Sequence, residues 1–374
     1  MIESRKKVTQ TKRWVVKLGS ALLTNEGCGL RVDSMNTWVM QIHELRQQGH
    51  EIVIVSSGAI AEGITRLGWE NRPHAVHELQ AAAAVGQMGL IKAWESCFQN
   101  YNIHTAQILI SHEVISNRES YLNARSTMRT LLRLGVIPVV NENDTVSTDE
   151  LLFGDNDKLA GMVTNLVDAE LLVLLTDQEG LYKADPRIHP DAEIIREAIA
   201  GDKALEKYAG EGSAFGRGGM KTKLQAASMA AKSGASTIIA SGLVTNILEQ
   251  IANGDDCGTF LRSNQAPLTA RKQWLAGQSQ VSGTLKIDQG AADVLSQQGK
   301  SLLAVGVVEI EGDFKRGEIV SCVDPDGKEI ARGQVNYGAY ETKKIIGQQS
   351  DKFEEILGYV DAAELIHRDD LVLL

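Results

Sequence analysis

The segment Asn141–Asp157 contains six carboxylates and three asparagines but no lysine or arginine. It directly follows an apolar stretch, Val136–Val140, that has the composition of a buried strand. A polar loop at the carboxyl end of a buried strand is where α/β enzymes bind ligands, and its carboxylates could hold Mg²⁺ or the ammonium group of a substrate. A solvated surface loop is the alternative reading, and it is the commoner one for an isolated acidic run.

Other polar clusters have the same placement. Lys17–Ser20, Ser56–Ile60 and Thr176–Tyr182 each follow or end an apolar, strand-like segment, and Gly216–Lys223 opens a helical pattern. Because the carboxyl ends of parallel strands meet at one edge of a sheet, we expect these clusters to converge in space with the acidic run. Their shared placement favours a ligand site over a set of unrelated surface loops.

Two of these clusters carry cations. Lys17 stands within an apolar strand, where a lysine is costly unless it is paired, so it lies either on a solvated edge strand or at a phosphate. Gly19 and Ser20 would let the backbone approach that phosphate. The glycines and lysines of Gly216–Lys223 are typical of a phosphate-binding loop at a helix N-terminus. By composition alone, a mobile surface loop is equally consistent with them.

Three other patterns are weaker evidence for a functional site. Ser57-Gly58 before a helix offers backbone N–H groups for a carboxylate, although many turns look similar. His74 and His77 have helical spacing but no carboxylate partner in the pattern, which indicates surface histidines rather than a metal site. Gly299–Ser301 lacks the first glycine of a Walker A motif and is expected to be an ordinary turn.

The elements that must position these clusters alternate between strand and helix. Such alternation predicts an α/β fold, a mostly parallel sheet sandwiched by helices. The expected strands are Trp14–Leu18, Ile52–Val55, Thr105–Ile110, Val136–Val140, Leu171–Leu175 and Thr237–Ala240. The expected helices are Val32–Gln48, His77–Phe98, one ending at Gly135, Lys158–Val167 and one after Gly219.

The pattern changes after about residue 280. Short strand-like segments separated by turn residues predict a small β-rich domain there. The expected strands are Leu302–Val308, Glu318–Val323 and Glu329–Val335. The sequence therefore predicts a catalytic domain over 8–265, a linker over 266–282 and a second domain over 283–374.

Composition narrows the class of protein. The 374 residues carry a net charge of −10, which argues against a general nucleic-acid binder. The four cysteines are far apart in the sequence, as expected for reduced thiols. The N-terminus does not have the pattern of a signal peptide, and no apolar stretch has the length of a membrane span. We therefore expect a cytoplasmic protein.

Taken together, the motifs resemble the amino acid kinase family. Lys17–Ser20 and Gly180–Arg187 occur widely in that family. Four motifs resemble more specifically its glutamate-phosphorylating branch: Ser56–Ala61, Asn141–Thr145, Gly154–Asp157 and Gly218–Lys223. The C-terminal segments Gly312–Glu318 and Leu357–Tyr359 resemble the PUA domain that follows this kinase in many bacteria.

The resemblance implies transfer of a phosphoryl group from ATP, with Mg²⁺, to the side-chain carboxylate of L-glutamate. A carboxylate is already ionised at neutral pH, so no general base is required. The site must instead supply cations that let this anion approach the phosphates of ATP. By resemblance, Lys17 and Lys223 neutralise the transferring group, and Asp157 orients both lysines.

The same resemblance supplies the binding residues. Glutamate ligands are implied at Ser57, Gly58, Asn141, Asp144 and Asn156. The nucleotide site is implied at Lys17, Thr176, Asp177, Arg217, Gly218, Gly219, Met220, Lys221, Thr222 and Lys223. The carboxylates that touch Mg²⁺ do not follow from the sequence. The family further implies feedback inhibition by proline near Ile60–Gly68, a homo-oligomer (dimer or tetramer), a place in proline biosynthesis and glutamyl-phosphate reductase as a partner.

Two alternatives stay open at this point. One is a kinase for another acidic amino acid such as aspartate, although aspartokinases usually carry a different regulatory module. The other is RNA binding through the PUA domain. Residues 283–374 hold 10 basic against 17 acidic side chains, which is opposite to the electrostatic footprint of a phosphate binder.

Overall fold

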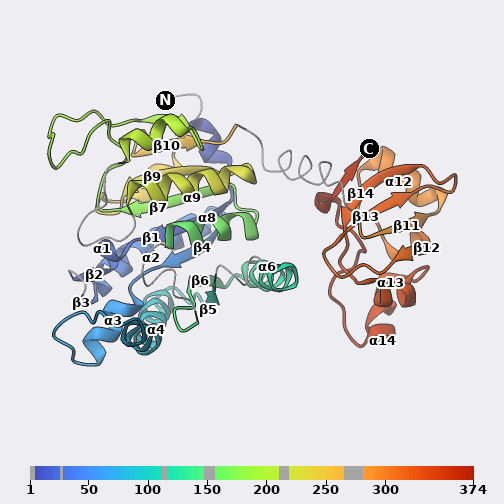
Figure 1. The fold of residues 1–374 in the computed structure, drawn as a ribbon, viewed down its shortest axis with the longest axis horizontal. Coiled ribbons are helices and arrows are strands. Elements are labelled where there is room, and N and C mark those ends of the chain that lie inside the picture. The colour runs from blue at the N-terminus through green and yellow to red at the C-terminus, as the bar shows by residue number, and fades with distance from the viewer. Residues whose placement is uncertain (1–4, 26–27, 112–116, 147–155, 210–218, 265–280) are drawn as a thin grey trace. The chain divides into compact units, whose positions relative to one another are not determined.

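The computed structural model describes residues 5–25, 28–111, 117–146, 156–209, 219–264 and 281–374. The chain forms two compact units, Met1–Ala266 and Pro267–Leu374 (Figure 1). No helix in the described ranges is both long and apolar enough to cross a membrane.

The first unit is built on a twisted sheet, in which the described residues form eight strands. In spatial order these are β5 (Thr105–Ile110), β6 (Ile137–Glu142), β4 (Glu51–Ser56), β1 (Arg13–Leu18), β7 (Leu171–Thr176), β9 (Ser236–Ser241), β10 (Thr259–Arg262) and β8 (Glu197–Ile199). The strands from β5 to β9 run parallel, β10 is antiparallel to β9, and β8 is parallel to β10. The predicted parallel α/β core is therefore confirmed, with two short reversed strands at one edge.

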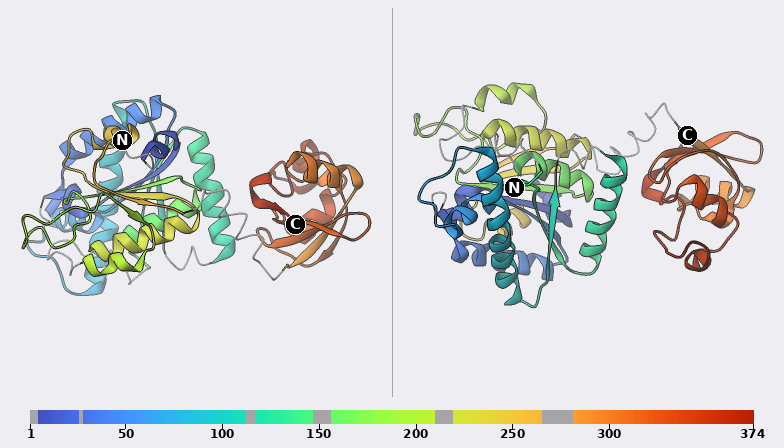
Figure 2. Two further views of the ribbon diagram at one scale, coloured as in Figure 1. Left: turned by 90° about the horizontal axis from the view of Figure 1, so that it is seen from above. Right: turned by 60° about the horizontal axis from the view of Figure 1, so that its bottom comes forward.

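Helices cover both faces of this sheet (Figures 1 and 2). One hydrophobic core lies between the sheet and α2 (Val32–Gln47), α4 (Val76–Gln99) and α10 (Ile247–Ala252). A second core lies on the opposite face, beneath α6 (Arg118–Arg133), α8 (Asn156–Leu166) and α9 (Met220–Lys232). The shorter elements of the unit are η1 (Arg5–Gln10), α1 (Ser20–Leu23), β2 (Thr24–Asn25), β3 (Cys28–Leu30), α3 (Ala59–Arg66) and η2 (Lys203–Tyr208).

The central strand β1 determines the direction in which Lys17 points. Trp14, Val16 and Leu18 pack in the core beneath α2 and α4, whereas Val15 packs in the core beneath α8 and α9. Successive side chains of a strand alternate between the two faces, so Lys17 lies on the face of α8 and α9. Lys17 is only 6% exposed, which excludes a solvated edge lysine.

Helices α3 and α4 approach each other at backbone distance. A Cβ atom added at Gly63 would lie 1.7 Å from the carbonyl oxygen of Ala82, and one added at Gly86 would lie 1.8 Å from that of Ala59. Only glycine tolerates contacts this close. The two helices are thereby fixed beside the turn at Ser57-Gly58, where α3 begins.

The second unit is a small five-stranded sheet with short helices, in the part of it that the structure describes. The strand order is β12 (Val307–Gly312), β11 (Gly283–Ile287), β13 (Ile319–Val323), β14 (Glu329–Gln334) and β15 (Leu371–Leu373). Its helical elements are α12 (Gln289–Gln298), η3 (Ala304–Gly306), α13 (Ala339–Ile345), η4 (Ser350–Lys352), α14 (Phe353–Leu357) and η5 (Arg368–Asp370). The sheet packs on its own hydrophobic core, which includes Phe314, Tyr337 and Phe353. The predicted β-rich second domain is therefore confirmed.

One local prediction needs correction, and the predictions for Gly299–Ser301 and for the two histidines agree with the structure. The strand expected at Leu302–Val308 begins only at Val307, because residues 304–306 form the turn η3 and Leu302 makes a single bridge to Ile366. Gly299 ends α12 in the left-handed conformation, so Gly299–Ser301 is a helix terminus rather than a phosphate loop. His74 and His77 are exposed, as expected for surface histidines.

Candidate active site

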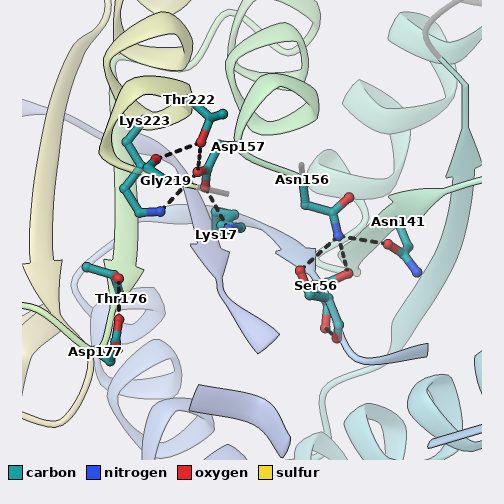
Figure 3. A network of polar contacts seen from close by, with 11 residues as sticks. Lys17, Ser56, Asn141, Asn156, Asp157, Thr176, Asp177, Gly219, Thr222 and Lys223 are labelled. Atoms are coloured by element: carbon teal, nitrogen blue, oxygen red, sulfur yellow. Dashed lines mark hydrogen bonds and ion pairs between the residues drawn. The ribbon is translucent and has the colours of Figure 1, made fainter. Parts of the chain in front are cut away.

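Two buried lysines of the first unit surround one fully buried carboxylate (Figure 3). Lys17 Nζ lies 2.6 Å from Asp157 Oδ1, and Lys223 Nζ lies 3.0 Å from Asp157 Oδ2. Asp157 is fully buried, and both lysine side chains are less than a tenth exposed. These three groups carry a net charge of +1 in a low-dielectric setting, which suits an incoming anion.

The elements explain why these residues meet. Lys17 points from β1 toward the face of α8 and α9, Asp157 lies in the first turn of α8, and Lys223 lies in the first turn of α9. The positive end of the α8 dipole favours a carboxylate at that position. Burial by itself would raise the pKa of Asp157, but Lys17 and then Lys223 overcome this effect and hold its pKa well below the ordinary value.

Thr222 joins the charged cluster to the start of α9. Its hydroxyl lies 2.8 Å from Asp157 Oδ2 and 2.8 Å from the carbonyl oxygen of Gly219. Gly219 directly precedes the helix, so the hydroxyl ties the helix start to the carboxylate. Of the other residues predicted here, Met220 is half-buried and Lys221 is exposed, while Arg217 and Gly218 lie outside the described residues.

A second network of uncharged amides begins one residue before Asp157. Asn156 Nδ2 shares its two hydrogens among three acceptors: the carbonyl oxygen of Ser56 at 3.1 Å, Ser57 Oγ at 3.0 Å and Asn141 Oδ1 at 3.0 Å. Asn156 Oδ1 is buried and has no hydrogen-bond partner among the described residues. Figure 3 shows the two networks side by side at the first turn of α8.

This network extends to two residues that the sequence patterns did not single out. Gln87 Oε1 accepts from Asn141 Nδ2 at 2.8 Å, and Ser56 Oγ accepts from Trp94 Nε1 at 2.9 Å. Both Gln87 and Trp94 lie on the buried face of α4. A signal for Gln87 did exist, because it stands at helical spacing between the buried residues Ala83 and Leu90, where an apolar residue is expected.

Ser57 and Gly58 form the turn between β4 and α3. Gly58 has φ +108°, a conformation that glycine adopts without strain, and an added Cβ would approach Leu30 to 3.2 Å. Since Ser57 Oγ accepts a hydrogen from Asn156, its own hydrogen can donate to an acceptor such as a substrate carboxylate.

Asp144 follows β6 in a half-buried turn, two residues after Glu142. Burial raises the pKa of Asp144 to about 6, and the nearby charge of Arg72 offsets part of that rise. Among the described residues, Asp144 makes no hydrogen bond to the amide network. What places it near the site is its position after β6, the strand that also carries Asn141.

The long acidic run therefore does not form one loop. Asn141 and Glu142 end a buried strand, and Asn156 and Asp157 open a helix, whereas Ser147–Asp155 lies outside the described residues. Within the described ranges no group of three or more His, Cys, Asp or Glu side chains could hold a metal ion.

Thr176 and Asp177 lie where β7 ends, next to β1 in the sheet. Thr176 Oγ1 donates to Asp177 Oδ1 at 2.9 Å. Beside them lies an open hollow of about 340 Å³, which is lined by Asp177, Gln178, Glu179, Tyr182, Pro186 and Arg187. The structure thus places the predicted nucleotide residues of this strand at the same sheet edge as Lys17.

Comparison with known proteins shows to which families the two parts of the chain are similar. Residues 12–241 match the amino acid kinase family, and residues 283–357 match the PUA domain. The glutamate 5-kinase of Thioalkalivibrio sulfidiphilus is 57% identical over 375 residues, which cover 100% of both chains. The glutamate 5-kinase of Ectopseudomonas mendocina is 59% identical over 371 residues, which cover 99% of this chain and 100% of the relative.

The shared carboxylate predicts a large stability effect. We expect Asp157→Asn to destabilise the first unit by about 3–5 kcal/mol, because two buried ammonium groups lose their counter-charge. Trp14, Trp38 and Trp94 are buried in this unit, so tryptophan fluorescence during urea unfolding measures the change.

Glu193→Gln is the matched control, because it breaks an exposed ion pair with Lys183 whose atoms lie 2.7 Å apart. Exposed pairs contribute little, so its urea midpoint should stay close to that of the unmodified protein. Equal shifts for the two variants would contradict a stabilising role of the buried cluster.

Proposed function

The chain belongs to the amino acid kinase family, and on that premise we propose that it transfers a phosphoryl group from ATP to the side-chain carboxylate of L-glutamate. The observation that carries the proposal is the pairing of a buried, net-positive lysine cluster with an amide-lined subsite at adjacent residues, Asp157 and Asn156. The names of the full-length relatives, glutamate 5-kinases, support the choice of substrate. The product is glutamyl 5-phosphate.

Electrostatic stabilisation is the chemical task of the cluster. The attacking carboxylate is ionised at neutral pH, so the residues need not remove a proton but must let two anions approach each other. Lys17 and Lys223 hold positive charge on the side of the phosphoryl group, and Asp157 keeps both ammonium groups in fixed positions. Because the charges are preorganised, little rearrangement is needed when negative charge develops on the transferring oxygens.

The amide network and its neighbours would hold glutamate. Ser57 Oγ and the Gly58 backbone can donate to a carboxylate, and Asn156 Oδ1 can accept from the ammonium group. Asp144 supplies a negative charge for that ammonium, and Asn141 holds the Asn156 amide in place. The two ends of the acidic run thus serve recognition of a zwitterionic substrate.

The nucleotide would lie over the carboxyl ends of β1 and β7. Thr176, Asp177 and the N-terminal turn of α9, Gly219–Lys223, border that position, and Arg217 and Gly218 are proposed to complete it. Bound Mg²⁺ would neutralise charge on the phosphates of ATP, whose oxygens supply most of its ligands.

The wider setting follows from the proposed reaction. We infer a role in proline biosynthesis in the cytoplasm, with feedback inhibition by proline near Ile60–Gly68, a homo-oligomeric state and glutamyl-phosphate reductase as the enzyme that takes the product. No observation on the second unit favours RNA binding, since its charge is negative.

A hydroxylamine trap for the acyl phosphate tests the proposed reaction. With ATP and Mg²⁺, we expect hydroxamate from L-glutamate and much less from aspartate or N-acetylglutamate, because the subsite matches a free ammonium group at a defined distance from the reacting carboxylate. Preferred turnover of aspartate would reassign the enzyme to another acidic amino acid.

Lys223 offers a test of the charge-stabilising role. We expect Lys223→Ala to lower kcat by about 10³-fold or more, as for other groups that neutralise a transferring phosphoryl group. The control is Lys232→Ala, an exposed lysine in the last turn of the same helix. A near-normal kcat for Lys223→Ala would remove Lys223 from the mechanism.

Asp144 gives the glutamate KM a characteristic pH dependence. Its pKa is about 6, so it is charged above that pH and protonated below it. We expect the glutamate KM to rise about tenfold per pH unit below pH 6, because a neutral carboxyl group no longer attracts the ammonium. Asp144→Asn should raise the KM at neutral pH and flatten this profile, and a profile unchanged by the substitution would exclude the role.

A further inference from the structure

We propose that Gln87 is a positioning residue for the substrate: it is the buried acceptor that holds in place an amide relay, which leaves Asn156 Oδ1 facing the ammonium group of the amino acid. The relay runs from Gln87 through Asn141 to Asn156 over hydrogen bonds of 2.8 and 3.0 Å. The inference rests on the proposed function and adds a residue that touches neither the charged cluster nor, by this proposal, the substrate.

The direction of the relay is set at one end by the main chain. The carbonyl oxygen of Ser56 can only accept, so Asn156 must present its NH₂ group there, at 3.1 Å. The same NH₂ group then requires an acceptor from Asn141, whose own NH₂ group is left to face Gln87. Gln87 must therefore offer its oxygen, and each of the three amides in the relay has one orientation.

Gln87 has a fixed position on α4, and its side-chain Nε2 has no hydrogen-bond partner among the described residues. Gln87 follows Gly86, whose contact with the carbonyl oxygen of Ala59 leaves no room for a side chain, so α4 cannot slide along α3. Gln87 is only 8% exposed, which limits the water that could replace it as an acceptor for Asn141.

The relay matters for recognition because it leaves a buried acceptor without a partner. Asn156 Oδ1 has no hydrogen-bond partner among the described residues, and Asn156 is 4% exposed. A buried acceptor of this kind is costly unless a ligand donates to it. The ammonium is the donor group of ionised glutamate, whose two carboxylates only accept. If Gln87 lost its oxygen, the NH₂ group of Asn141 would lose its acceptor and Asn141 could rotate. Asn156 would then be held by Ser56 and Ser57 alone, and its Oδ1 would be directed less firmly toward the ammonium.

The test compares glutamate with glutarate, which has both carboxylates but no ammonium. In Gln87→Met we expect the glutamate KM to rise about tenfold or more, while kcat and the inhibition constant of glutarate change less than about twofold. This selective loss measures coupling between Gln87 and an ammonium group that it does not contact. A purely structural defect would weaken both ligands together.

Two further variants sharpen the comparison. Gln87→Glu keeps an acceptor for Asn141, so its glutamate KM should rise less than that of Gln87→Met, whereas a packing role predicts that the uncharged methionine is the better replacement. Gln41→Met removes another buried glutamine, on α2, and should leave the glutamate KM unchanged. Thermal unfolding of each variant confirms that the folded enzyme is measured, and Gln87→Leu carries the same prediction if Gln87→Met does not fold.

The outcomes separate this inference from the proposed function. If the unmodified enzyme forms no hydroxamate from glutamate, the proposed function fails and the inference with it. If the unmodified enzyme is active but Gln87→Met weakens glutarate as much as glutamate, or weakens ATP instead, or changes neither ligand, only the role of Gln87 is overturned.

Discussion

The structure of the site depends on one carboxylate that two lysines share. Asp157 is fully buried and lies within 3.0 Å of both ammonium groups, so removing it would leave two positive charges without their counter-charge in the interior. The three residues come from β1, α8 and α9, elements far apart in the sequence. The cluster therefore fixes these elements at the sheet edge, and the same fixed charges suit the phosphoryl group of a nucleotide.

The first turn of α8 divides the site into two parts of different character. Asp157 enters the charged network, and its neighbour Asn156 enters the network of uncharged amides. Consecutive residues of a helix point in different directions, so one turn can serve both networks without mixing them. Phosphoryl transfer needs the two ligands at a defined separation, and a single rigid helix turn provides that separation more reliably than two independent loops.

Much of this could be predicted from the sequence, and the failures have physical reasons. The strand–helix alternation and the clusters at strand ends indicated the parallel sheet and the convergence at Lys17 and Asp157. The short strands β8 and β10 escaped notice because three or four residues show no periodicity. A polar residue at a buried helical position marked Gln87 as unusual, but its role arises only from the contact with Asn141 at the end of β6, a tertiary contact that no local pattern encodes. The sites predicted within residues 147–155 and 210–218 stay predictions, because these residues lie outside the described ranges.

The choice of an asparagine rather than an aspartate at position 156 follows from the same division. A carboxylate there would have no hydrogen to donate to the carbonyl oxygen of Ser56, so the two oxygens would repel each other. It would also stand beside Asp157 and compete for Lys17 and Lys223, drawing positive charge away from the phosphoryl side. An amide avoids both effects, because it donates to the main chain and still presents an oxygen to a cationic ligand. In the proposed mechanism, charge is thus confined to the part of the site that faces the phosphoryl group, and the direction of hydrogen bonds distinguishes the substrate beside it.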